Sequence, residues 1–188
     1  MHTLICGTTE CGKTTLARII LNQWIRINGN NSAIVFDPLT AKWPVKVYHD
    51  VDTFLALATK EKSKLIIVDE SGTSLSRFEA SHNWLATQSR HRGHSVVFIS
   101  QRPALLSPTI RNQCSMLFCF CVSENDAISL ASDFVEPELI KAPTLKQFHC
   151  IKKMRFKKIE LLKVSYRDMT IRKMTKNHCD SAETSQTE

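Results

Sequence analysis

The sequence predicts an α/β fold in which a mostly parallel sheet carries helices on both faces. Strand-like and helix-like segments alternate along the chain, which is the pattern of such folds. Residues 65–68, Leu-Ile-Ile-Val, form a continuous apolar run, as expected for a strand buried on both faces of a parallel sheet. The first strand-like segment, 3–6, leads through a loop with two glycines directly into a helical segment.

Apolar periodicity and turn residues place each element in chain order. The expected strands are 3–6, 32–36, 45–48, 65–68, 95–100 and 116–122. The expected helices are 14–28, 50–62, 76–88, 108–112 and 123–134. The turn residues 28–31, Asn-Gly-Asn-Asn, end the first helix, and Ser123 or Asn125 can cap the last one.

The pattern changes near residue 148. Residues 148–153 and 156–164 predict two antiparallel strands around Met154 and Arg155. They form the core of a basic hairpin at about 146–164. The final residues, 176–188, are polar and aperiodic, which predicts a disordered tail. The chain length of 188 residues suits one domain, and we expect it to span 1–170.

The loop after the first strand has the pattern G-x-x-x-x-G-K-T, which predicts a phosphate-binding loop. Its glycines allow backbone N–H groups to approach an anion closely, and the following helix adds its positive end. Lys13 can reach the β- and γ-phosphates, and the Thr14 hydroxyl can ligate Mg²⁺. The loop alone does not distinguish ATP from GTP. The expected nucleotide-binding residues are Gly7, Thr8, Thr9, Glu10, Cys11, Gly12, Lys13, Thr14 and Thr15.

Polar residues follow two later strands and complete a candidate catalytic site. Asp69 ends the apolar run 65–68 and can hold Mg²⁺, while Glu70 can polarise an attacking water. Gln101 follows strand 95–100, and its neutral amide can contact the γ-phosphate or that water. The expected activity is therefore hydrolysis of a nucleoside triphosphate, with Asp69 and Thr14 as metal ligands.

A cluster of basic residues, 90–94, precedes the strand 95–100. Arg90 and Arg92 can bind nucleic-acid phosphates or reach the nucleotide of a neighbouring subunit as an arginine finger. They can also simply complement the dipole of the preceding helix. Arg102 and Arg111 are weaker candidates for the same role.

The charge of the chain is concentrated in its C-terminal part. The formal net charge is +7, and residues 141–176 alone hold twelve Lys and Arg against two acids. This asymmetry favours a polyanionic partner, although a solvated lysine-rich hairpin would look the same. The seven cysteines are scattered, without a CxxC pair, and predict reduced and mostly buried thiols. We find no apolar stretch long enough to span a membrane and no room for a signal peptide before the loop, which favours the cytoplasm.

Together these elements resemble the FtsK–HerA superfamily of P-loop ATPases, and within it the genome-packaging ATPases of tailless, internal-membrane viruses and phages. The resemblance extends over about 1–164. Its motifs are the loop 7–14, the strand end 68–70, and a segment that reads Arg-His-Arg-Gly, apolar strand, Ser-Gln, Pro and Ile-Arg across 90–111. The ending of the second strand, Asp37-Pro38, also fits.

The resemblance implies a RecA/FtsK-like P-loop ATPase that uses ATP and Mg²⁺. It implies a homo-oligomeric ring, a hexamer, that translocates double-stranded DNA into a preformed capsid, with an arginine of one subunit completing the neighbour's site. It also implies a place in the host cytoplasm or associated with the virion, with capsid-vertex or membrane proteins as candidate partners.

Three other functions remain open from the sequence. Filamentous-phage assembly ATPases of the Zot type share the loop but normally carry a transmembrane segment. A small-molecule nucleotide or nucleoside kinase would need a phosphate-binding lid, for which 90–94 is a poor match. A nucleotide-gated binding module would not need Glu70.

Overall fold

The structure, a computed structural model, describes residues 1–38, 42–69 and 79–174. Nine strands form one sheet in the order β3-β2-β4-β5-β1-β6-β7-β8-β9. The strands are β1 (Thr3–Cys6), β2 (Ala33–Phe36), β3 (Val47–Tyr48), β4 (Leu65–Val68), β5 (Ser95–Ser100), β6 (Met116–Cys119), β7 (His149–Met154), β8 (Glu160–Ser165) and β9 (Thr170–Lys173).

The six strands from β3 to β6 in this order run parallel. Their carboxyl ends therefore meet at one edge of the sheet, called here the carboxyl edge, and their amino ends at the opposite amino edge. The central strands β1 and β4 are buried throughout, which explains their uninterrupted apolar sequences. The α/β fold with a mostly parallel sheet is confirmed.

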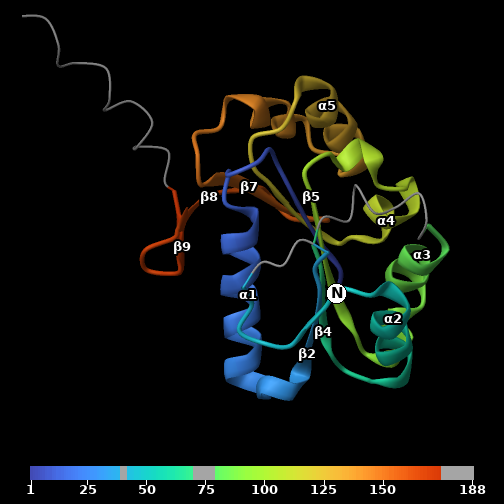
Figure 1. The fold of residues 1–188 in the computed structure, drawn as a ribbon. Coiled ribbons are helices and arrows are strands. Elements are labelled where there is room, and N and C mark those ends of the chain that lie inside the picture. Colours follow the sequence, from blue (N-terminus) through green and yellow to red (C-terminus); the bar gives the residue numbers. More distant parts are fainter. Residues whose placement is uncertain (39–41, 70–78, 175–188) are drawn as a thin grey trace, which may run out of the picture.

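Helices cover both faces of the sheet unequally (Figure 1). The helix α1 (Lys13–Asn28) lies alone on one face, where Leu16 and Ile19 enter a buried cluster with Ile5 and Val97. The other face packs against α2 (Val51–Lys60), α3 (Glu79–Thr87), α4 (Pro108–Gln113) and α5 (Glu124–Asp133). Short 3₁₀ helices are η1 (Asn30–Ser32), η3 (Ser89–Arg92), η4 (Pro103–Leu105) and η5 (Pro137–Thr144).

Local capping explains where two of these helices begin. The Asp50 carboxylate accepts the Thr53 N–H at 2.8 Å, so α2 starts one residue later than expected. Ser123 accepts the N–H of Asp126 at the start of α5, which confirms Ser123 as the cap. Of the helix predicted at 76–88, residues 76–78 lie outside the described part.

The antiparallel part contains the largest departures from the expected strands. The hairpin of β7 and β8 is confirmed, but β8 begins at Glu160 rather than at 156. Phe156 has a φ of +65°, a turn conformation that no strand residue adopts. A further strand, β9, pairs with β8 and was not expected, because its sequence Thr-Ile-Arg-Lys has too few apolar residues to indicate a strand.

Three of the parallel strands are shorter than expected. The strand predicted at 32–36 loses only Ser32, which lies in η1. The strand predicted at 116–122 ends at Cys119, although the Phe120 N–H still donates to the carbonyl of Cys6 at 2.9 Å. The strand predicted at 45–48 is reduced to Val47–Tyr48. The predicted tail, 176–188, lies outside the described residues. In the part of the chain that the structure describes, no helix is both long and apolar enough to cross a bilayer.

Candidate nucleotide site

The loop between β1 and α1 forms a compact turn at the carboxyl edge. It is tied to the neighbouring chain, since the Thr8 N–H donates to the carbonyl of Cys121 at 2.8 Å. At Gly7 a Cβ would lie 2.6 Å from Phe120 Cβ and 2.7 Å from Cys11 Sγ, so a side chain cannot fit. Close packing beneath the loop therefore requires the first glycine of the motif.

The second glycine and the start of α1 prepare an anion site. Gly12 has a φ of +114°, which favours glycine, and α1 begins at the next residue. No side chain caps this helix, so the N–H groups of its first turn stay available. Uncapped N–H groups and the positive end of the helix dipole together bind phosphate well.

Lys13 is folded over the loop. Its ammonium donates to the carbonyl oxygen of Thr8 at 2.8 Å, and the residue is only 8% exposed. A buried ammonium held by one neutral acceptor has donors left for a phosphate oxygen. The position supports the role expected for Lys13.

The predicted γ-phosphate contact also lies at the carboxyl edge, beside the loop. The Thr9 hydroxyl donates to Gln101 Oε1 at 3.2 Å, which joins the loop to the end of β5. Asp69 follows β4, the next strand, and is 6% exposed. The strand order thus places β5 between the loop and Asp69. Glu70, the predicted base, lies outside the described residues.

A pocket of about 400 Å³ opens on the other side of the loop. Its walls include residues 12–15 at the start of α1, together with Gln147, Phe148 and Tyr166 from the C-terminal strands. These last three residues were not predicted to belong to the site. Their sequence signal is weak, because they lie more than 130 positions from the loop and only the antiparallel strands bring them to it.

A scan of protein families decides what kind of protein this is. Residues 3–122, well over half of the chain, match the model of the ATPase family associated with various cellular activities (AAA). The chain belongs to the AAA ATPase family. The match includes the loop, Asp69 and Gln101. The expectation of a nucleotide-hydrolysing enzyme is confirmed by it. No curated protein matches the ATPase significantly by sequence.

Solved structures similar to the ATPase include a viral protein. The genome packaging NTPase B204 from Sulfolobus turreted icosahedral virus 2, in complex with sulfate, is 20% identical, with a TM-score of 0.66 over 85% of this chain and 94% of that one. The same NTPase in complex with ATP-gammaS has a TM-score of 0.63 and is 17% identical over 92% and 96% of the two chains.

Two further solved structures share the fold. EccC (ATPases 2 and 3) of Thermomonospora curvata is 18% identical, with a TM-score of 0.67 over 88% of this chain and 37% of that one. VirB4 of Thermoanaerobacter pseudethanolicus is 8% identical, with a TM-score of 0.63 over 83% and 87%. At these identities the likenesses show the fold alone, and this fold agrees with the one that the resemblance to packaging ATPases implied.

Arg90 and Arg92 of the ATPase lie at the amino edge, opposite their own loop. The helix η3 that carries them precedes β5, and the Arg92 carbonyl accepts the N–H of Ser63, just before β4. The charge of Arg90 helps to lower the pKa of His2, which precedes β1, so the two side chains are near one another. Both arginines are exposed, and from this edge they cannot reach the loop of their own chain.

Arg111 is engaged within its own chain. Its guanidinium pairs with Asp133 at 2.6 Å and donates to the carbonyls of Pro103 and Leu106 at 3.2 and 2.7 Å. It ties α4 to α5 and η4, which is a structural role. Arg102 is exposed and follows Gln101 at the carboxyl edge, so among the weaker candidates it lies nearest to the loop.

One of the two histidines in the basic segment 90–94, His94, has a structural position. The Nδ1 of His94 accepts the Lys64 N–H at 3.1 Å, and Nε2 lies 3.1 Å from the Ala58 carbonyl. The partners require the neutral tautomer with the proton on Nε2. Burial lowers the pKa of His94, in agreement with this arrangement.

Internal partners neutralise part of the basic C-terminal segment. Glu160 pairs with Lys173 and Lys152 at 2.7 and 2.9 Å, and these hydrogen bonds lower its pKa to about 2. Lys153 is buried and pairs with Glu136 at 2.7 Å. Five exposed basic residues of the segment have no ion pair within the described residues: Lys146, Lys157, Lys158, Lys163 and Arg167.

The cysteines in the described part of the chain are unpaired, and five of these six are buried. Burial raises the pKa of Cys11 in the loop, and it raises the pKa of Cys114 to about 12. Both are therefore neutral thiols that pack as small apolar groups. The expectation of reduced, mostly buried thiols is met where the structure describes them.

Proposed function

We propose that this ATPase is a motor that moves double-stranded DNA, and that its task is to package a viral genome into a preformed capsid. The observation that carries the proposal is the likeness of fold to a genome packaging NTPase over nearly the full length of both chains. The motifs that the sequence shares with packaging ATPases support it independently.

The site residues suit ATP with Mg²⁺. Thr14 and Asp69 present oxygen atoms at the carboxyl edge, and oxygen is the ligand that Mg²⁺ prefers. No cluster of three or more His, Cys, Asp or Glu side chains that could hold a metal occurs among the described residues, which agrees with an ion held jointly by protein and nucleotide phosphates. Bound there, Mg²⁺ would neutralise charge on the phosphates.

The chain's own residues divide the remaining work. Lys13 would leave the Thr8 carbonyl to bind phosphate oxygens, and Glu70 would accept a proton from the attacking water. Gln101 would exchange its bond with Thr9 for one to the γ-phosphate or to that water. Loss of the γ-phosphate would then change the hydrogen bonds of Gln101 at the end of β5.

The strand β5 offers a route to a neighbouring subunit. Its six residues span the sheet from the Arg90–Arg92 segment at the amino edge to Gln101 at the carboxyl edge, about 20 Å. In a hexameric ring, these arginines would reach the next subunit's nucleotide. The exposed unpaired residues of the C-terminal segment, such as Lys157 and Lys158, would contact DNA phosphates.

The test is the rate of ATP hydrolysis with and without double-stranded DNA at two salt concentrations. We expect stimulation by DNA that weakens steeply with salt, because phosphate contacts release counterions. Lys157→Ala with Lys158→Ala should reduce stimulation and leave the basal rate unchanged, whereas Lys141→Ala, at a lysine paired with Glu138, is the matched control. A rate that DNA does not change at either salt concentration contradicts the proposal.

The subunit arrangement has its own test. Mixing Arg90→Ala subunits with Lys13→Ala subunits should restore part of the activity that each variant lacks alone, since an intact arginine then faces an intact loop. Mixtures that stay inactive at all ratios count against an arginine acting across an interface.

The proposed base has a test of its own. Glu70→Gln should keep ATP binding and lose hydrolysis.

A polypeptide motor is the second candidate. The likeness to EccC, whose structure is described as a complex with a signal sequence peptide, favours it. Stimulation by an unfolded peptide instead of DNA would support this alternative. A small-molecule kinase is less well supported, because the Arg90–Arg92 segment lies opposite the loop and cannot close over it. The Zot-type function, the cytoplasmic or virion-associated location and the capsid-vertex or membrane partners stay predictions.

A further inference from the structure

The C-terminal strands bring two aromatic side chains to the phosphate-binding loop. Phe148 immediately precedes β7 and Tyr166 immediately follows β8, and both line the pocket of about 400 Å³ beside the loop. Strand β7 is antiparallel to β6 and β8 is antiparallel to β7, so the start of β7 and the end of β8 lie at the carboxyl edge.

Hydrogen bonds fix this part of the pocket to the loop. The Phe148 N–H donates to the carbonyl of Cys11 at 3.0 Å, and its own carbonyl accepts the N–H of Val164 at 2.8 Å. The amide of Gln147 donates to the carbonyl of Glu10 at 3.0 Å. The Phe148 ring also lies against Gly12, where a Cβ would be 2.9 Å from Cδ1. The pocket and the loop therefore form one built unit.

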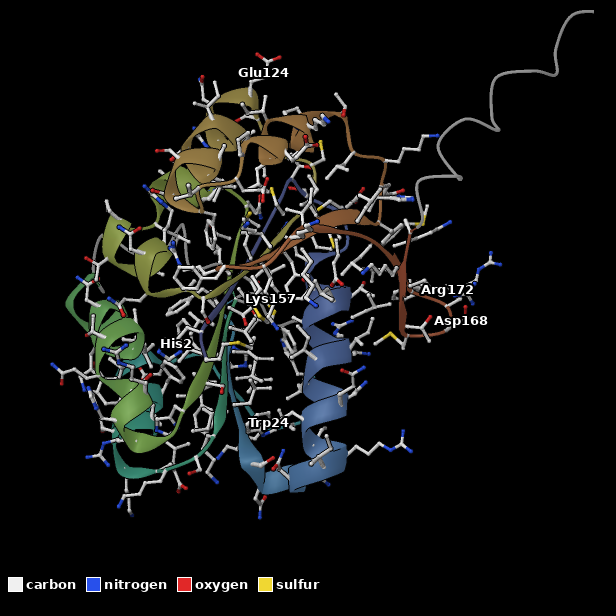
Figure 2. All side chains as sticks on the ribbon, turned by 180° about the vertical axis from the view of Figure 1, so that it is seen from behind. His2, Trp24, Glu124, Lys157, Asp168 and Arg172 are labelled. Carbon is white, nitrogen blue, oxygen red and sulfur yellow. The ribbon has the colours of Figure 1, made fainter. Side chains whose placement is uncertain are left out.

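The Tyr166 ring is accessible, and hydrogen bonds hold the turn that carries it. In the turn between β8 and β9, the Ser165 hydroxyl donates to the Asp168 carboxylate at 3.1 Å, and Asp168 also approaches Arg172 at 3.9 Å. Figure 2 shows Asp168 and Arg172 together on this hairpin, beside α1. Met169 packs into the core below, while Tyr166 itself is 63% exposed. Its ring can thus be covered by a ligand.

The order of the strands indicates how a nucleotide bound at the loop would be oriented. Gln101 and Asp69 follow β5 and β4 on one side of β1, whereas Phe148 and Tyr166 belong to β7 and β8 on the other. A triphosphate with its γ-phosphate toward Gln101 must leave the loop with its nucleoside toward the aromatic side. The pocket lies there, next to residues 12–15, and its volume is within the range of small-molecule sites.

We propose that this pocket is the nucleobase site and that Tyr166, supported by Phe148, stacks against the base. The inference rests on the proposed binding of nucleotide at the loop. Stacking tolerates any base, because every base has a π-face. Apart from the residues at the helix start and Tyr166, the polar side chains that line the pocket are Glu10, which is exposed, and Gln147, whose amide already donates to the loop. The pocket therefore offers no buried polar side chain there to read the base edge. The enzyme should therefore accept GTP nearly as well as ATP.

Calorimetric titration with ATP and with inorganic tripolyphosphate, both with Mg²⁺, tests the proposal. Tyr166→Ala should weaken ATP binding about tenfold and leave tripolyphosphate binding unchanged, because only the base loses a partner. Tyr166→Phe should bind both as the wild type does. Phe156→Ala is the matched control, because that aromatic is fully exposed at 102% in the turn at the opposite edge of the sheet.

Two results overturn the proposal while nucleotide binding at the loop stands. One is an unchanged affinity of Tyr166→Ala for ATP, and the other is an equal loss for ATP and tripolyphosphate, which would show a disturbed loop. A preference for ATP over GTP above about 100-fold would also overturn it, because discrimination of that size needs hydrogen bonds to the base. If the wild type binds neither ligand, the proposed nucleotide site itself fails.

Discussion

Replacing Gly12 by alanine should separate backbone strain from steric conflict at the start of α1. With φ at +114°, an alanine pays about 1–2 kcal/mol for the left-handed backbone. Its Cβ would also lie 2.9 Å from Cδ1 of Phe148 and 3.2 Å from Cε1 of Phe120, and such overpacking costs about 1–3 kcal/mol. The free energy of unfolding should therefore fall by about 2–5 kcal/mol.

Gly29→Ala is the matched control. Gly29 also has a positive φ, +86°, but its ψ of 162° lies in a region essentially restricted to glycine, so its backbone cost is about 1–3 kcal/mol. A Cβ there would meet nothing within 4 Å, so no steric cost is added. The smaller conformational freedom of the unfolded alanine chain affects both variants equally and cancels in the comparison. Urea unfolding at equilibrium measures both changes, and titration with ATP measures the loop.

A double-mutant cycle with Phe148→Leu isolates the contact. The smaller side chain should recover about 1 kcal/mol of the loss at Gly12 and none at Gly29, since the coupling exists only where the two groups touch. Gly12→Ala should also weaken ATP binding strongly, while Gly29→Ala should bind normally. The reasoning fails if Gly12→Ala costs no more than the backbone cost of about 1–2 kcal/mol, or if Phe148→Leu changes both glycine variants equally.

Three further predictions concern pH, an ion pair and catalysis. Burial, with the N-terminal amine and Arg90, lowers the pKa of His2 from 6.5 to about 4, so the unfolded chain binds its proton first and stability is lost as pH falls from 6.5 to 4. His2→Asn, which can keep an acceptor for the Val96 N–H, should remove up to about 3 kcal/mol of this loss in thermal unfolding; identical pH profiles would refute it. Arg111→Ala should lower the free energy of unfolding by about 3 kcal/mol, because the Asp133 carboxylate loses its partner, and a loss below about 1 kcal/mol would make the pair irrelevant. Gln101→Ala should reduce kcat about 100-fold with ATP affinity retained; an unchanged kcat would exclude it from the reaction.

The parallel half of the fold was predictable because its signals are local. The residues of the apolar run 65–68 and of the glycine loop after 3–6 favour their conformations locally. In the structure these segments are β4 and the turn before α1. The antiparallel half was predicted less well. The exposed strand β9 carries almost no apolar pattern, and Phe156 looks like a strand residue until its positive φ is seen.

The site shows the same division. Gly7, Lys13 and Gln101 could be predicted as site residues from the sequence, because each belongs to a spacing or strand end whose chemistry is local. Their contact could not, since the Thr9–Gln101 bond joins residues 92 positions apart. Arg111 read as a candidate finger until its pairing with Asp133 was visible, because a sequence does not show which charges meet.

The sequence by itself determined that this chain has a phosphate-binding loop in an α/β fold, because the loop's conformation depends on neighbouring glycines and a following helix. Only the tertiary structure decided what surrounds the loop. The order of the strands places Gln101 on one side and Tyr166 on the other, and the direction of β5, parallel to β1, places Arg90 at the opposite edge. Strand order depends on which apolar faces pack together between segments that lie far apart in the sequence. No single local segment can therefore predict it.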